Sequence, residues 1–510
     1  MSENQTMLDY LLVYPDYSMW SYEEDMCEEI LEQYGEISEN PFLVENGLSL
    51  STEAEVPEYN LETLPFFQTV KNQESGETLT PRGHQYELTE VPEGTRKSAR
   101  YLGHGLHEYT GKFYPQLVST IFSLLDLEAG DTVMDPFCGS GTTLYQGRLE
   151  SLNTVGIDIN PFSVYLSRTK VSTLDVDLSE MREFSFSCKT LTSEEYTLPE
   201  PDYLDKWFED PVINQVRGLH SQISDVQNDQ VRQLLFITLS DLLRTVSHQD
   251  EDQIRVLRAD EIPEDVDVYE MFEDRFNKNV KRVEDTQDFK TKFDLNEETV
   301  VEQADATTMA EETSLPDIDH MVCSPPYATG LPYVDTYRLS LFTLGLLEKK
   351  DRRDLERQVI GNREIRPQEK EDLEAEFLDN YDSLWLPDNV KELIKRVYDL
   401  NVDADVGFRR KNKAALLYKY FRDMRDVLDQ GHQMLPEGGN FVLVVGRNTT
   451  KAGDDKEVVE IPTDDFLYDI GEMVGYEKAN LVEKSLNSTA IGEVHSKNAI
   501  QEEKILFLEK

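Results

Sequence analysis

DTVMDPFCGSGTTLYQGRLESLNTVGIDINP, residues 131–161, is the stretch of the 510-residue chain that decides its fold. Its first apolar run, 132–134, predicts a short buried strand that ends at Asp135. Gly139 and Gly141 follow at once, and they allow a tight turn in which a ligand can approach the backbone closely. A strand that runs into such a turn is typical of an α/β protein with a bound ligand.

The second half of this stretch strengthens the prediction. Residues from Thr142 onward favour a helix, and residues 154–157 predict a second strand that ends at Asp158. In a Rossmann-like unit, a carboxylate about twenty residues beyond the glycines accepts hydrogen bonds from ribose hydroxyls. The order of strand, turn, helix, strand and acid therefore predicts a ligand that contains a nucleoside, rather than a merely structural turn.

A second site is predicted where MVCSPPYATGLPYVDTYRLSLF begins at Met321. The apolar start predicts a buried strand, and Pro325 and Pro326 give it a rigid exit that cannot continue a sheet. This exit holds Ser324 and Tyr327 in a fixed relation at the end of a strand, which is where open α/β sheets bind their ligands.

Together, DPFCGSGTT and SPPY resemble the cofactor and catalytic motifs of the amino-methyltransferase family, which methylates exocyclic amines of DNA bases with S-adenosylmethionine. HEYTGKFYPQLV resembles the family's segment over the methionine end of the cofactor, IDINP its ribose loop, and EQADAT the turn that faces the adenine amine. The resemblance implies catalytic residues Ser324, Pro325, Pro326 and Tyr327, and no metal. The cofactor-binding residues that it implies are Lys112, Phe113, Pro115, Asp135, Pro136, Phe137, Gly139, Ser140, Gly141, Thr142, Asp158, Asn160 and Asp305.

The resemblance also implies an α/β fold of the Rossmann-like class I methyltransferase type, with a mostly parallel seven-stranded sheet whose last strand is reversed. We expect an acidic N-terminal extension over residues 1–95, rich in turn residues and short helical patterns, and a cofactor-binding half over 96–170. Apolar residues at three- and four-residue spacing predict a helical insertion over 171–298. The catalytic half, 299–510, includes a charged segment at 349–413.

The order of the motifs leaves the target-recognition region open. The cofactor motif precedes the catalytic motif here, whereas many family members with this glycine loop have the reverse order. The candidates are residues 171–298 and 349–413. Basic residues nearly balance acids in the second segment, although the chain has 101 acids and 50 lysines and arginines. This enrichment favours phosphate contact, and a solvated helix with intrahelical ion pairs is the alternative.

The chemistry expected at Ser324 follows from the substrate. An exocyclic amine of a base is a poor nucleophile because its lone pair is delocalised, so acceptors must hold its protons. The Ser324 hydroxyl and the Pro325 carbonyl would do so, while Tyr327 would stack on a base rotated out of the duplex. Within the family, serine in this position mostly accompanies N4-methylcytosine, and aspartate or asparagine mostly accompanies N6-methyladenine.

We therefore predict methylation of cytosine N4 in double-stranded DNA. The alternatives are adenine-N6 methylation of DNA, base methylation of RNA, and an acidic DNA mimic or scaffold with an inactive methyltransferase fold. A cognate restriction endonuclease is compatible with the prediction, while the target sequence and the oligomeric state stay open.

The four cysteines, Cys27, Cys138, Cys188 and Cys323, have no CxxC or Cys-His spacing, which argues against a disulfide framework and a structural zinc. Methylation of cytosine C5 would need a cysteine nucleophile, usually after proline, and the chain has no Pro-Cys pair. Cys138 and Cys323 are therefore interpreted as small buried residues.

Six further residues allow two interpretations each. Tyr333, Asp335, Tyr337 and Arg338 form either a strand-to-helix connection or a lip over the flipped base. His104 and His107 either order the segment over the cofactor or touch DNA.

The formal net charge of -51 is unusual for a nucleic-acid binder. The acids are spread along the chain, which favours adaptation to a halophile's cytoplasm, because molar salt shortens the Debye length to roughly 3 Å. No apolar run is long enough to cross a bilayer, and the N-terminal residues lack the pattern of a secretory signal. We therefore expect a cytoplasmic protein.

Overall fold

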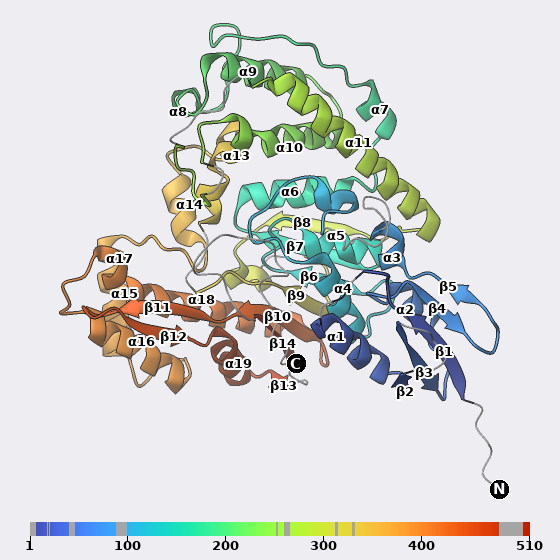
Figure 1. Cartoon of the computed structure of the whole chain (residues 1–510). Helices are drawn as coiled ribbons and strands as arrows, with labels where there is room; N and C mark the ends of the chain where they lie inside the picture. The colour runs from blue at the N-terminus through green and yellow to red at the C-terminus, as the bar shows by residue number, and fades with distance from the viewer. Residues whose placement is uncertain are drawn as a thin grey trace.

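The computed structural model describes residues 7–17, 19, 21–39, 46–87, 99–250, 253–259, 266–311, 315–328, 332–478 and 503–510. A central sheet carries a helical lobe on one side, a second lobe built largely from the charged segment, and a small N-terminal sheet (Figure 1). In the described part of the chain, no helix is both long and apolar enough to cross a membrane.

The central sheet has seven strands in the order β13-β14-β10-β9-β6-β7-β8. β6 pairs in parallel with β7 and β9, whereas β14 is antiparallel to both of its neighbours. The predicted Rossmann-like sheet with a reversed last strand is confirmed. Its strands are β6 (Thr132–Asp135), β7 (Asn153–Asp158), β8 (Thr299–Gln303), β9 (His320–Cys323), β10 (Asn440–Gly446), β13 (Glu477–Lys478) and β14 (Glu503–Glu509).

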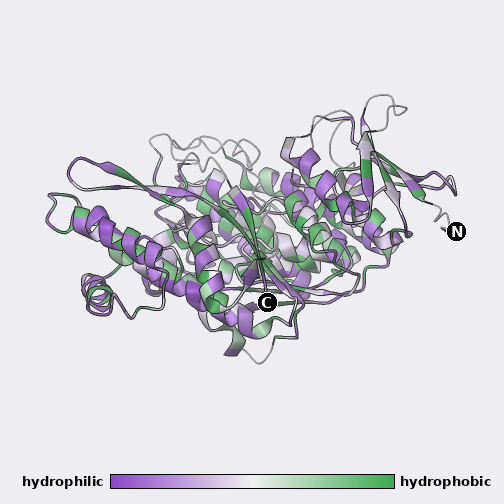
Figure 2. Ribbon diagram, turned by 90° about the horizontal axis from the view of Figure 1, so that it is seen from below, coloured by the Kyte–Doolittle hydropathy of each residue, from purple (hydrophilic) through white to green (hydrophobic). Residues whose placement is uncertain are grey.

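Helices cover both faces of this sheet because successive strand residues point to opposite sides. On β6, Val133 packs in the core formed with α4 (Pro115–Leu124), whereas Met134 packs with residues of α18 (Lys413–Met434). The central strands are largely hydrophobic in Figure 2, while the outlying helices carry many hydrophilic residues. Also packed beside the sheet are α5 (Thr142–Leu149), α6 (Pro161–Ser172) and α19 (Thr463–Val474).

Helices of the insertion form the lobe at the top of Figure 1. Phe162 and Leu166 of α6 share a core with Leu235 and Leu239 of this lobe and with Phe272, so the lobe is joined to the sheet by apolar packing. The helices are α7 (Leu178–Glu183), α8 (Pro201–Leu204), α9 (Asp210–Ser224), α10 (Asp229–Val246) and α11 (Val268–Phe293).

Residues 324–327 form a loop after β9, which we call the catalytic loop after its predicted role. The charged segment follows this loop and two short helices, α12 (Tyr333–Thr336) and α13 (Arg338–Thr343). It forms α14 (Arg352–Gln358), α15 (Pro367–Asp379), α16 (Asp388–Asn401) and α17 (Phe408–Lys411). The last three lie beside the antiparallel pair of β11 (Asn448–Ala452) and β12 (Glu457–Ile461), at the left of Figure 1.

The N-terminal region contains short helices and, in addition, an antiparallel sheet of order β2-β3-β1-β4-β5 that the sequence analysis did not predict. Arg82 ties this region to the central domain by donating to Ser151 Oγ at 2.9 Å. Its elements are β1 (Leu8–Val13), α1 (Ser21–Glu32), β2 (Glu36–Glu39), β3 (Gly47–Thr52), α2 (Glu58–Thr63), β4 (Thr69–Asn72), β5 (Thr78–Leu79) and α3 (Arg82–Glu87).

Candidate active site

A cavity that is partly open to solvent lies where β6, β7, β8 and β9 end. The chain order reverses at β6, between β7 and β9, so the cavity occupies the topological switch point of the sheet. Thirteen predicted residues line it: Lys112, Phe113, Asp135, Pro136, Phe137, Gly139, Ser140, Thr142, Asp158, Asn160, Asp305, Ser324 and Pro326.

Four predicted residues lie outside this lining. Pro115 is the first residue of α4, and Gly141 caps α5 with a φ of 71°. Pro325 is buried in the catalytic loop, and Tyr327 is half-buried beside it. Pro115 and Gly141 thus border the cavity through the backbone that they shape, since proline suits a first helical turn and glycine suits a positive φ.

The glycine turn is fixed by contacts on both sides. The Gly139 N–H donates to Asp158 Oδ2 at 3.0 Å, and the Ser167 hydroxyl donates to the Gly139 carbonyl at 2.9 Å. A Cβ on Gly141 would lie 2.8 Å from Ser167 Oγ, so only glycine lets the turn pack against α6. The turn between β6 and α5 is therefore held rigidly at one wall of the cavity.

Asp158, at the end of β7, offers carboxylate oxygens as hydrogen-bond acceptors, and a donor, Asn160 Nδ2, is two residues further along the chain. Asp158 Oδ1 accepts from the backbone N–H of Asn160 at 2.8 Å, and burial raises the pKa of Asp158 to about 6. The Asn160 side chain is buried, and its Nδ2 has no hydrogen-bond partner among the described residues. A buried donor beside a carboxylate matches the hydroxyls of a sugar, which can both donate and accept.

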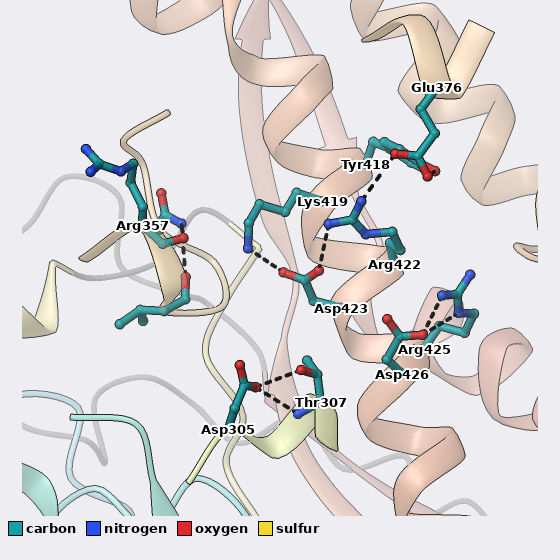
Figure 3. A network of polar contacts seen from close by, with 12 residues as sticks. Asp305, Thr307, Arg357, Glu376, Tyr418, Lys419, Arg422, Asp423, Arg425 and Asp426 are labelled. Atoms are coloured by element: carbon teal, nitrogen blue, oxygen red, sulfur yellow. Dashed lines mark hydrogen bonds and ion pairs between the residues drawn. The ribbon is translucent and has the colours of Figure 1, made fainter. Parts of the chain in front are cut away.

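Two further carboxylates line the cavity. Asp135 is buried, its carboxylate accepts from the Phe137 N–H at 2.9 Å, and burial raises its pKa to about 7. Asp305 follows β8, and its Oδ1 accepts from the N–H and the hydroxyl of Thr307 at 2.9 and 2.8 Å (Figure 3). Three strand ends therefore present carboxylates at one edge of the sheet.

The segment before α4 covers one side of the cavity. Lys112 Nζ donates to the carbonyls of Ala99 and His104, and burial lowers the pKa of this lysine. His104 is buried, and His107 Nε2 lies 3.0 Å from Ser240 Oγ. Both histidines are therefore part of the packing that orders this segment.

The sequence did not indicate an aromatic stack beside the cavity. Tyr109 stacks on Tyr337 with ring centroids 4.9 Å apart, and Tyr337 stacks on Phe162 at 4.9 Å. Tyr333 faces Tyr109 at 6.4 Å, and both line the cavity. Tyr337 is thus buried inside the stack, while Tyr333 presents an aromatic ring to the ligand space.

Asp335 and Arg338 serve the connection between strand and helix. Asp335 pairs with Arg338 at 3.1 Å and with Arg352 at 3.2 Å. The Arg338 guanidinium lies 5.7 Å from the ring centroid of Trp207, which joins the connection to the helical lobe. Of the four residues considered for a lip, only Tyr333 lines the cavity.

The charged segment also contributes to the cavity through Gln358, Val359 and Ile360 at the end of α14. Gly361 follows them with a φ of 74°, and a Cβ there would lie 2.4 Å from the Tyr327 carbonyl oxygen. Because of this close approach, the charged segment packs directly against the catalytic loop. In the sequence, Gly361 could have indicated this contact between the charged segment and the catalytic loop, since a glycine is needed where two backbones approach closely.

The catalytic loop is also anchored by α18. The buried Tyr420 of α18 donates its hydroxyl proton to the Pro326 carbonyl at 2.9 Å. Cys323, at the end of β9, and Cys138 are buried, and burial raises the pKa of both thiols, as suits structural cysteines. Ser324, half-buried between Cys323 and the prolines, faces the cavity on a rigid support.

Comparisons with known proteins agree with this architecture. A family model described as DNA methylase, of the N6 and N4 methyltransferases, matches residues 27–169. The Type II methyltransferase M.MvaI of Kocuria varians is 23% identical over 397 residues, which are 73% of this chain and 82% of that protein.

Two further relatives are also Type II methyltransferases. M.BsoBI of Geobacillus stearothermophilus is 24% identical over 73% of this chain and 78% of its own. M.MjaII of Methanocaldococcus jannaschii is 36% identical over 113 residues, 20% of this chain and 21% of its own. The sheet order, the cavity at its switch point and these matches support the DNA amino-methyltransferase family as the family that this chain resembles.

Proposed function

We propose that this enzyme transfers the methyl group of S-adenosylmethionine to the exocyclic N4 amine of a cytosine that is flipped out of double-stranded DNA. The observation that carries the proposal is that Ser324 lines the same cavity as Gly139, Asp158 and Asp305. One cavity thus joins the predicted cofactor residues to the predicted amine acceptor.

The residues of the cavity fit S-adenosylmethionine. The Asp158 carboxylate and the Asn160 Nδ2, which has no partner among the described residues, suit the ribose hydroxyls, and Asp305 at the neighbouring strand end suits the adenine amine. Gly139 leaves the wall beside them without a side chain. When bound, the cofactor supplies an electrophilic methyl group on a sulfonium.

The catalytic loop would act on the incoming amine. The Ser324 hydroxyl and the Pro325 carbonyl would accept hydrogen bonds from the two amine N–H groups, which localises the nitrogen lone pair and aims it into the cavity. Tyr420 holds the Pro326 carbonyl, so the loop does not need to reorganise during the reaction. Tyr327 is the proposed stacking partner of the flipped base, and Tyr333 offers a second aromatic face at the cavity wall.

The choice of base rests on Ser324 and is tested by the product. We expect N4-methylcytosine when methylated duplex DNA is digested to nucleosides and analysed by mass spectrometry. The same assay on RNA of the same sequence is the control and should give no methylated base. N6-methyladenine as the sole product would overturn the choice of base and leave the family assignment intact.

We also propose that the acidic surface is an adaptation to high salt, because 101 acids are spread along a chain with 50 lysines and arginines. The acids repel one another in dilute buffer, and molar KCl screens them over roughly 3 Å. We expect circular dichroism to show full helicity only toward molar KCl, with loss of structure in dilute buffer. Full helicity and activity at about 50 mM salt would contradict this adaptation.

A cognate restriction endonuclease is the proposed partner in the cell, since the relatives are described as Type II methyltransferases.

A further inference from the structure

Asp335 lies at the centre of a chain of charged side chains next to the cavity. Its Oδ1 contacts Arg338 Nη1 at 3.1 Å and Arg352 Nη1 at 3.2 Å. Arg352 Nη1 also contacts Glu356 Oε2 at 2.9 Å. None of these four side chains is more than 16% exposed, so all of them are largely removed from water. We call this chain of contacts the ion-pair network.

The ion-pair network joins three parts of the fold. Asp335 belongs to α12, whereas Arg352, 17 positions later, is the first residue of α14. Arg338 begins α13, and its Nη2 donates to the Val256 carbonyl of the helical insertion at 3.0 Å. The carboxylate of Asp335 therefore ties α12 both to α14 and, through Arg338, to the insertion.

Two of the joined helices line the cavity. α12 contributes Tyr333, and the end of α14 contributes Gln358, Val359 and Ile360. Successive residues of an α-helix are turned by about 100°, so residues 333 and 335 point to nearly opposite sides of α12. The Tyr333 ring faces the cavity, while Asp335 holds the same helical turn from behind.

Other ion pairs of the charged segment lie within a single helix. Lys370 pairs with Glu374 at 2.5 Å in α15, and Lys391 pairs with Asp388 at 2.8 Å in α16. These are the intrahelical pairs that the sequence allowed for this segment, and such pairs stabilise their own helix only slightly. The pair of Arg352 with Asp335 instead connects two elements that both form walls of the cavity.

α12 needs such a connection because it consists of one turn, which is marginal by itself. Val334 of α12 and Leu355 of α14 share a hydrophobic core, but apolar contacts have no preferred direction. A hydrogen-bonded ion pair is directional and fixes the rotation of the turn. Largely buried ion pairs also add little net stability, since their charges lose hydration, so a role in fixing geometry is the better explanation.

We propose that Asp335 is a positioning residue, which holds α12 against α14 so that the Tyr333 ring stands at the cavity wall as a second stacking partner of the flipped base. The proposal rests on the proposed function for the identity of this ligand as a base of duplex DNA.

The first test is Asp335→Asn, which keeps the size of the side chain and removes the charge between the two guanidinium groups. We expect kcat/KM for duplex DNA to fall on the order of 10-fold, since a misplacement of about 1 Å can cost up to about 100-fold. Calorimetry should show nearly unchanged S-adenosylmethionine affinity.

Glu62→Gln is the matched control. It makes the same change from acid to amide in a carboxylate that accepts from Arg82 at 2.8 and 3.1 Å, in the N-terminal region and outside the cavity lining. Thermal unfolding reports the stability of both variants. The control should keep the parent's kcat/KM for DNA.

A second measurement separates positioning from a general loss of stability. Flipping a base costs least when the base is mismatched. Placing the target base of the parent's duplex in a mismatch should therefore restore most of the activity of Asp335→Asn, because the variant captures the base poorly. Ser324→Ala, whose expected defect is in turnover, should not recover.

The route through Tyr333 is tested by combining two substitutions. If Asp335 acts by placing this ring, Tyr333→Ala together with Asp335→Asn should be no worse than Tyr333→Ala alone. Arg352→Lys keeps the charge but loses the planar guanidinium, and it should show the same recovery on the mismatched duplex as Asp335→Asn. It replaces Asp335→Asn in the comparison if that protein does not fold.

Four results would overturn the positioning role: an equal loss in Glu62→Gln, a loss of cofactor affinity in Asp335→Asn, no recovery on the mismatched duplex, or additive losses with Tyr333→Ala. Failure of the proposed function is a separate outcome. If the parent methylated adenine instead, the same comparison with a mismatched adenine would keep the role of Asp335 while the choice of base was lost.

Discussion

Replacement of Ser324 with alanine is expected to lower kcat on the order of 100-fold, because it removes an acceptor that strengthens as the amine nitrogen becomes tetrahedral. Ser324 is half-buried and lines the cavity, so its loss changes little of the packed core. Affinities for S-adenosylmethionine and for duplex DNA should stay nearly constant. Single-turnover methylation, calorimetry and DNA binding measure the three quantities separately.

Ser140→Ala is the matched control for this variant. Ser140 lies in the same cavity but in the glycine turn, where its hydroxyl is 3.3 Å from that of Thr142. We expect its replacement to affect cofactor affinity more than kcat. Full turnover by Ser324→Ala would remove the role assigned to the catalytic loop.

Replacement of Gly139 with valine is expected to reduce S-adenosylmethionine binding below detection. Gly139 has a φ of 49°, which a β-branched residue adopts only at a cost of about 1–2 kcal/mol. A Cβ there would lie 3.4 Å from the Tyr109 ring, in ordinary contact, and the rest of the side chain would occupy the ligand's space. Isothermal titration calorimetry measures the loss.

Gly438→Val separates the backbone cost from the cavity effect. Gly438 has a φ of 80°, and a Cβ there would meet no atom within 4 Å. It lies outside the cavity lining, in the turn before β10. This variant should lose stability in thermal unfolding and keep cofactor affinity, whereas unchanged affinity in Gly139→Val would contradict our placement of the cofactor.

The sequence alone was sufficient to predict the turns and strand ends that form the site. Gly139 and Gly141 required a turn with positive φ, and Pro325 and Pro326 required a rigid exit from a strand, because backbone sterics act within a few residues. The residue pattern placed Asp135 and Ser324 each at the end of a strand, and the structure shows that these two strands are parallel neighbours. The resemblance to the family supplied the reversed last strand.

Long-range contacts were decided only by the tertiary structure. Apolar spacing indicates that a side chain is buried, but it does not specify the partner against which it packs. The stack of Tyr109 on Tyr337 joins residues 228 positions apart, and the hydrogen bond from Tyr420 to Pro326 joins residues 94 apart. The sequence around each of these residues gives no indication of the distant residue that it contacts.

The N-terminal sheet has the same explanation. β1 pairs with β3 and β4, which follow it only after intervening elements such as α1 and α2, so no local pattern indicates these pairings. Local sterics thus determined the turns and strand ends of this protein, whereas the path of the whole chain determined which distant side chains share a site.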